Sequence, residues 1–160
     1  MPLKITLKPN ERIVIDGAVV TNGSTTCNLF IENFVPILRE KDVMSERDAY
    51  SPCRRIYFVI QLMYLDKENP AAYYNTYWDL VKAVLEAAPN MLGLIDQISE
   101  HILENNYYKA LKLSKDLINY EEEEIGHVFK STSGVRHGEQ NDPFRPRNRG
   151  CSLDQSSIET

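Results

Sequence analysis

The 160-residue chain contains no long apolar run and none of the short motifs that mark common catalytic sites. A helix that spans a bilayer needs about 18 or more mostly apolar residues in a row, and no stretch approaches that length. The motifs GxGxxG, GxxxxGK(S/T), HExxH and GxSxG are absent, and seven glycines leave little room for a phosphate-binding loop. We therefore predict no membrane segment, no catalytic residue and no cofactor, and we do not expect an enzyme.

The three cysteines are Cys27, Cys53 and Cys151. They are widely separated, form no CxxC pair and have no pair of histidines near them in the sequence. This spacing predicts no metal site, and reduced thiols are expected. The N-terminal stretch MPLKITLKPNERIV alternates polar and apolar residues, whereas a secretory leader would place a basic segment before an apolar block. We therefore expect a cytoplasmic protein.

The formal net charge of −5 is unevenly distributed. Residues 1–60 carry eight Lys/Arg and seven Asp/Glu, a net +1, and residues 61–130 carry six and twelve, a net −6. The remaining residues carry four of each. A polyanion such as RNA should therefore approach the N-terminal part, because the field of the middle region repels it.

The N-terminal residues show the period of two that is typical of β-strands. Apolar and polar residues alternate over 3–7, 13–15 and 27–31. Asp16-Gly17 lies between two apolar stretches, and this dipeptide readily adopts the positive φ angles of a two-residue hairpin turn. We predict a hairpin there and a further strand after it.

The period changes to that of helices after residue 45. Ser51-Pro52 is a helix start, with a capping serine and a proline at the first helical position. The helix after it is apolar on more than one side, which predicts the central helix of the core. Apolar spacing predicts three more helices that include 74–85, 91–104 and 107–120.

These patterns predict the α+β class. A small antiparallel β segment covers 1–40, and a body of four to five helices over 41–125 packs with it as a single domain. Residues 126–160 are rich in Ser, Gly, Asn, Pro and Arg with few apolar anchors, and they predict a disordered tail.

Two clusters in the helical region allow more than one interpretation. The glutamates at 121–124 could bind a metal or a partner, but a dense run of like charge is more typical of a solvated, fraying helix end. The aromatic residues Tyr73, Tyr74, Tyr77 and Trp78 could form a platform on which bases stack. Because the adjacent helix is acidic and repels phosphate, exposed Tyr73 and Tyr74 would favour a protein partner over RNA. Their helical spacing is more typical of a core with one exposed edge, so they are partner-binding candidates only if they are exposed.

Basic residues of the N-terminal part are candidates for binding an RNA backbone. Lys4 and Lys8 lie on one strand face by the period of two, opposite the apolar residues. Solubility or protection of a strand edge would explain the same lysines without any ligand. The full candidate set for RNA binding is Lys4, Lys8, Arg12, Arg39, Lys41, Arg54 and Arg55.

Several long segments resemble the FlbT family of flagellar regulators. They are MPLKITLKPNERIVIDGAVVTNG, IENFVPILREKD, RRIYFVIQLMYLD and NNYYKALKLSKDLINYE, and the resemblance covers about residues 1–121. The family pattern more usually has glycine in place of Asn10 and asparagine in place of Asp16, and both replacements suit turns. The tail beyond residue 126 lies outside the shared pattern.

The resemblance implies control of flagellin synthesis after transcription. Family members act on the 5′ untranslated leader of flagellin messenger RNA, alter its translation and decay, and work alongside the small regulator FlaF. Some repress flagellin and others promote it. The family supplies no catalytic residue, in agreement with the missing motifs.

Two hypotheses follow. In the first, the basic β segment binds the leader RNA directly, and exposed rings such as Phe30 or Phe34 contact unpaired bases. In the second, the acidic helical surface with Tyr73 and Tyr74 binds FlaF or flagellin, and the effect on RNA is indirect. A homodimer is a further expectation, because a second copy could complete an unpaired sheet edge.

Overall fold

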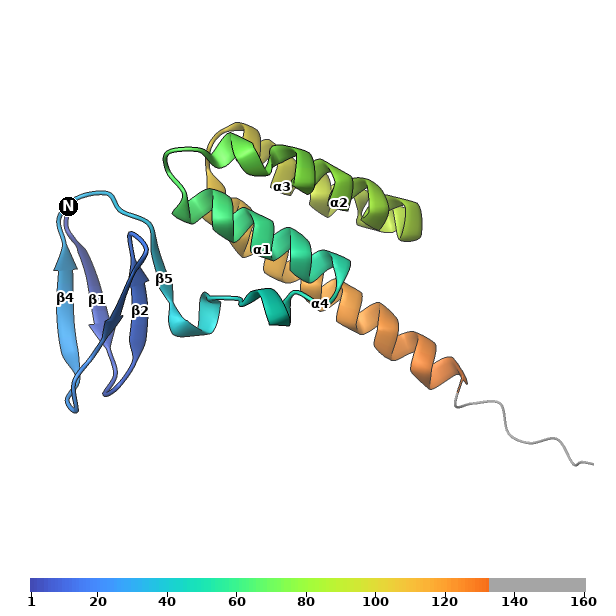
Figure 1. Cartoon of the computed structure of the whole chain (residues 1–160). Helices are drawn as coiled ribbons and strands as arrows, with labels where there is room; N and C mark the ends of the chain where they lie inside the picture. Colours follow the sequence, from blue (N-terminus) through green and yellow to red (C-terminus); the bar gives the residue numbers. More distant parts are fainter. Residues whose placement is uncertain (133–160) are drawn as a thin grey trace, which may run out of the picture.

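The structure, a computed structural model, describes residues 1–132 and confirms the α+β class (Figure 1). An N-terminal group of short antiparallel strands precedes a helical body. The strands are β1 (Leu3–Leu7), β2 (Arg12–Ile15), β3 (Ala18–Thr21), β4 (Cys27–Ile31) and β5 (Ile37–Arg39). The α-helices are α1 (Pro52–Leu65), α2 (Tyr74–Ala87), α3 (Leu92–Leu103) and α4 (Tyr107–Thr132). Single 3₁₀ turns connect several of them: η1 (Glu40–Asp42), η2 (Glu46–Asp48), η3 (Pro70–Tyr73) and η4 (Pro89–Met91).

The strands form two small sheets, one of order β1-β4 and one of order β3-β2-β5. The predicted hairpin is confirmed between β2 and β3, where Asp16 (φ 50°) and Gly17 (φ 82°) both have positive φ. These angles define a turn whose twist matches that of the flanking strands. The third strand predicted over 27–31 is also confirmed, and it pairs antiparallel with β1.

β5 joins two separate apolar clusters. A small cluster lies between the sheets around Ile5, Leu7 and Ile13, and Ile37 packs against it. The next residue, Leu38, belongs to the larger helical core. Consecutive side chains of a strand point to opposite faces, so this short strand contributes to both cores. The Ile37 N–H also donates to the hydroxyl oxygen of Tyr64 at the end of α1 (2.9 Å).

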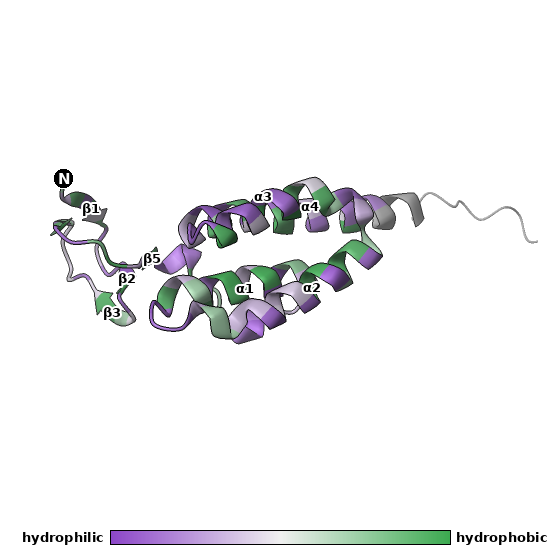
Figure 2. Cartoon of the chain, turned by 90° about the horizontal axis from the view of Figure 1, so that it is seen from above, coloured by the Kyte–Doolittle hydropathy of each residue, from purple (hydrophilic) through white to green (hydrophobic). Residues whose placement is uncertain are grey.

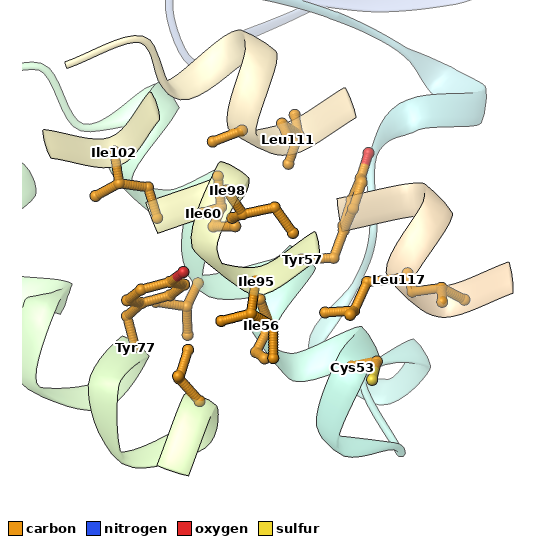
Figure 3. Close-up of a cluster of buried hydrophobic side chains, with 14 of the residues drawn as sticks. Cys53, Ile56, Tyr57, Ile60, Tyr77, Ile95, Ile98, Ile102, Leu111 and Leu117 are labelled. Atoms are coloured by element: carbon orange, nitrogen blue, oxygen red, sulfur yellow. The ribbon is translucent and has the colours of Figure 1, made fainter. Parts of the chain in front are cut away.

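The helices form two layers, α1 with α2 and α3 with α4, and the β segment lies at one end of the body (Figure 2). α1 begins as predicted at Ser51-Pro52, because the Ser51 hydroxyl accepts the Arg54 N–H (3.3 Å). Its apolar residues contact both α2 and α4, which confirms it as the central helix. Figure 3 shows the core, where apolar side chains of all four helices point toward one another: Ile56, Ile60, Tyr77, Ile95, Ile98, Leu111 and Leu117.

α4 is longer than predicted. It runs to Thr132, past the predicted end of the helical body at 125, and projects beyond the other helices (Figure 1). The remaining part of the predicted tail, with Cys151, lies outside the described residues. Cys27 is half-buried and Cys53 is buried, and both are free thiols; burial raises the pKa of Cys53 to about 12. Within residues 1–132, no helix is both long and apolar enough to cross a membrane.

The packing of the core predicts that substitutions at two positions of α3 have very different effects on stability. The Ile98 side chain is 0% exposed and Leu103 is 69% exposed. Ile98→Ala should lower the free energy of unfolding by about 2–5 kcal/mol, because it leaves a cavity in the core. Leu103→Ala, the matched control, should change it by about 0.5 kcal/mol or less. Urea denaturation followed by circular dichroism measures both, and equal losses would contradict this assignment of the core.

Candidate nucleic-acid interface

The outer face of the β1–β4 pair presents a lysine, a phenylalanine and an asparagine to solvent. Ile5 and Leu7 point inward and are buried, so the alternate residues of β1 must point outward. In the antiparallel register Lys4 lies opposite Phe30, and Thr6 lies opposite Asn28. The outer face therefore combines side chains from two strands that are far apart in sequence.

Contacts within this face fix how its side chains are presented. The Lys4 ammonium lies over the ring of Phe30, 5.9 Å from its centroid, and Phe30 is 60% exposed. The Thr6 hydroxyl donates to Oδ1 of Asn28 (2.8 Å). Because Oδ1 takes this bond, the amide N–H donors of Asn28 stay available for a ligand. We define Lys4, Thr6, Asn28 and Phe30 as the ribbon face.

The ribbon face has the groups that bind single-stranded RNA elsewhere. An exposed ring can stack on an unpaired base, a lysine can neutralise a phosphate, and an amide can donate to a base edge. None of these roles needs a bond to be made or broken. Lys8 extends the face at the end of β1, where the Asn22 amide donates to its carbonyl oxygen (2.7 Å) and holds the β3–β4 connection in place.

Arg12 and Arg39, by contrast, are engaged in ion pairs. The Nε of Arg12 donates to Glu40 (2.9 Å), and these hydrogen bonds lower the pKa of the Glu40 carboxyl. Arg39 pairs with Glu11 (3.1 Å) and also donates to the carbonyl oxygen of Thr6 (3.3 Å). The charge of each guanidinium is therefore largely balanced within the protein.

Arg54 and Arg55 lie far from the ribbon face. They are at the start of α1, whereas Tyr64, which contacts β5, is ten residues after Arg54. Ten residues of helix span about 15 Å along the axis, so Arg54 and Arg55 lie at the end of α1 away from β5. Arg54 pairs with Glu122 (2.6 Å) and lies over the ring of Tyr50. The Nε of Arg55 donates to the carbonyl oxygen of Ala49 (3.2 Å).

The seven predicted cations thus do not form one surface. Lys4 lies on β1, Lys8 directly follows that strand, and Lys41 lies apart from them in η1. Among the side chains that the structure describes, no carboxylate forms an ion pair with any of these three lysines. Sequence reasoning missed Thr6 and Asn28, because only the pairing of β1 with β4 brings them together.

Tyr73 and Tyr74 are half-buried against the helical core. Their hydroxyls are engaged within the protein, Tyr73 with Asp66 (3.1 Å) and Tyr74 with Tyr107 (2.8 Å). Of the next two aromatic residues, Tyr77 is buried and Trp78 is exposed, as expected for a core with one exposed edge. These contacts favour a packing role for both candidate partner-binding residues.

The predicted helix end at 121–124 is wrong, because α4 continues through the whole run to Thr132. The run is solvated as predicted from Glu122 to Glu124, which are exposed. Glu121 accepts a hydrogen bond from Ser51, and Glu122 pairs with Arg54. Both carboxylates lie beside the N-terminus of α1, where unsatisfied N–H groups favour negative charge. Within the part of the chain that the structure describes, no group of three His, Cys, Asp or Glu could hold a metal ion.

Comparison of the sequence with known proteins identifies the family of this chain. The family model described as "Flagellar protein FlbT" matches residues 3–125. A protein of Caulobacter vibrioides (strain ATCC 19089 / CIP 103742 / CB 15) named "Flagellum biosynthesis repressor protein FlbT" is 41% identical over 140 residues, 86% of this chain and 97% of its own length. A "Probable flagellum biosynthesis repressor protein FlbT" of Rhodopseudomonas palustris (strain TIE-1) is 45% identical over 123 residues, 77% and 97% of the two chains. No solved structure matches the chain.

The match of the family model includes all five strands, α1 to α3 and most of α4, so it extends over both the β segment and the helical body. The resemblance seen in four sequence segments is thereby confirmed across the described fold. The chain belongs to the FlbT family of flagellar proteins.

Proposed function

We propose that this protein regulates flagellin synthesis by binding the 5′ untranslated leader of flagellin messenger RNA through the ribbon face and Lys8. The names of its relatives, flagellum biosynthesis repressors, support a regulatory role in flagellar synthesis and make repression the expected sign. Binding near the start of the message would alter its translation and decay. The protein would act by occupying RNA, so no catalytic group is needed.

The observation that carries this proposal is Lys4 over the exposed ring of Phe30 beside the free amide donors of Asn28. A ring of this kind can stack on any base, and the amide can select among base edges. Double-stranded RNA offers neither unstacked bases nor accessible edges in its deep groove. The ligand should therefore be an unpaired segment of the leader.

The charge distribution also supports an approach of RNA to the β segment. Residues 61–130 carry a net charge of −6, whereas the ribbon lies at the opposite end of the body from the glutamates of α4 (Figure 1). Lys4 and Lys8 are the predicted cations on this ribbon that keep their charge unpaired. An RNA strand is thus attracted to one end of the molecule and repelled from the other.

The alternative proposal, binding of FlaF or flagellin with an indirect effect on RNA, rests on the acidic helical surface. Direct titration of a labelled leader and a scrambled control, with and without FlaF, separates the two. Leader-selective binding by the protein alone supports direct recognition. Selectivity that arises only with FlaF present would favour the alternative.

Removal of the two lysines should reduce the salt dependence of binding. The variant Lys4→Ala/Lys8→Ala loses two phosphate contacts, so the slope of log K against log salt should decrease by about 1.4, at about 0.7 per contact on single strands. Arg12 is left unchanged because Glu40 already holds it. Fluorescence anisotropy across salt concentrations measures the slope.

The matched control Lys82→Ala/Lys112→Ala removes the same charge from the helical body and should leave the slope unchanged. If the control lowers the slope as much as the β1 variant does, general electrostatics accounts for the binding and the assignment to β1 is wrong.

Loss of the stacking ring should have a different signature. Phe30→Ala should weaken leader binding by about 1–3 kcal/mol without changing the salt slope, because no charge is removed. Phe30→Trp should retain the affinity, since it keeps a flat ring. Val19→Ala on β3, another exposed apolar position, serves as the control. Unchanged affinity of Phe30→Ala in a folded protein, checked by circular dichroism, would remove the stacking role.

A further inference from the structure

A groove of about 1050 Å³ lies between the β segment and the helical body. One wall comes from β1 and the connection 32–36 between β4 and β5. The other comes from the C-terminal end of α1 and the beginning of α4. In Figure 1 this connection arches over one end of the β segment, from β4 to β5. The groove is thus distinct from the ribbon face, and only Lys4 belongs to both.

Exposed apolar side chains gather around this groove. Met1, Leu3, Phe34 and Tyr108 all line it, and all are exposed. Phe34 has 90% of its surface open to water. Soluble proteins rarely leave large apolar side chains together on one surface unless that surface binds something. The groove therefore has the character of an interface whose occupant is apolar.

The charges on the groove narrow the choice of occupant. Three of the six ionised side chains that line it are neutralised: Arg39 by Glu11, Lys67 by Asp16, and Asp42 by Lys115. Glu32 and Lys109 are exposed on opposite walls, and neither forms an ion pair within the described residues. One unpaired anion, Glu32, and two unpaired cations, Lys4 and Lys109, thus remain on a single patch.

We infer that the occupant is a second copy of this chain, joined through a two-fold axis at the groove. An interface of this kind uses the same patch on both copies, so the patch must carry both halves of every contact. This patch does so: Phe34 projects beside a groove that can receive it, and Glu32 has the charge opposite to that of Lys109. In the dimer Phe34 enters the groove of the second copy, and Glu32 of each copy faces Lys109 of the other.

Other occupants fit less well. An RNA strand could pair with Lys4 and Lys109, but it would bring its phosphates against Glu32 and against the apolar side chains of Met1 and Leu3. An unrelated protein would have to supply a matching cavity and opposite charges, whereas a second copy already contains them. The dimer leaves Phe30 and Asn28 on the ribbon face open, whereas Lys4 lines both the groove and that face.

Light scattering coupled to size exclusion, over a range of concentrations, tests the dimer on the full chain. The expected mass is twice the 18.4 kDa of one chain. Phe34→Glu should shift the protein to a monomer, since the side chain is exposed and its loss should not affect folding. Val19→Glu places the same charge on the exposed β3 edge and should remain dimeric. A monomer mass for the unmodified chain at every concentration would overturn the dimer, and so would monomers from Val19→Glu alone.

A charge exchange tests the predicted ion pair. Glu32→Lys and Lys109→Glu each place like charges together twice in the dimer, so each should weaken dimerisation by about tenfold or more. An equimolar mixture of the two variants should form heterodimers, because both pairs are then opposite in sign. The double variant Glu32→Lys/Lys109→Glu should dimerise as the unmodified chain does.

Failure of both the mixture and the double variant to restore dimers would overturn this geometry. A second outcome would also overturn the dimer: the unmodified chain is a monomer, and Phe34→Glu abolishes leader binding. The groove would then be assigned to RNA. If the dimer is confirmed while Phe30→Ala leaves leader binding intact, only the proposed function fails, so the two proposals are separately testable.

Discussion

The position of β5 between two apolar cores is the constraint on which the rest of the structure depends. Ile37 packs into the β cluster and its neighbour Leu38 into the helical core, and Tyr64 fixes the strand through the Ile37 N–H. Full burial of a leucine side chain stabilises by about 1.5–3 kcal/mol, and here this energy also sets the placement of one part of the molecule against the other. Val14 of β2, which packs against the helical core, and the ion pair of Lys67 with Asp16 support the same orientation of the β segment, on which the groove depends.

The same arrangement determines which residues can meet a ligand. Because Ile5 and Leu7 must cover the small β cluster, Lys4 and Thr6 are forced to the outside of the ribbon. Arg12 and Arg39 instead meet carboxylates and are neutralised. On the ribbon, Lys4 and Lys8 keep an unpaired charge. Packing and electrostatics therefore select the same face.

Sequence patterns predicted the features that depend on neighbouring residues and missed those that depend on distant ones. The turn at Asp16-Gly17 and the helix start at Ser51-Pro52 follow from local conformational preferences, and both were predicted correctly. The contact between Thr6 and Asn28 joins residues 22 positions apart, and the pair of Arg12 with Glu40 spans 28. No period or motif encodes such pairings. The full length of α4 escaped prediction for the same reason, because Glu121 is held by Ser51, 70 residues away.

One ribbon face is a small binding site, with two lysines, one ring and one amide. Sites dominated by a few phosphate contacts commonly bind RNA or DNA with dissociation constants of about 10⁻⁴ to 10⁻⁶ M, which is weak for a regulator. A two-fold dimer would present two such faces on one particle. Once the first face is bound, the second meets the same RNA at an effective concentration in the millimolar range, which can raise the avidity by about 10² to 10⁴. The two proposals would then reinforce each other: the groove would supply the affinity that a single ribbon lacks, and a leader with two unpaired segments at the right separation would be selected over one with a single segment.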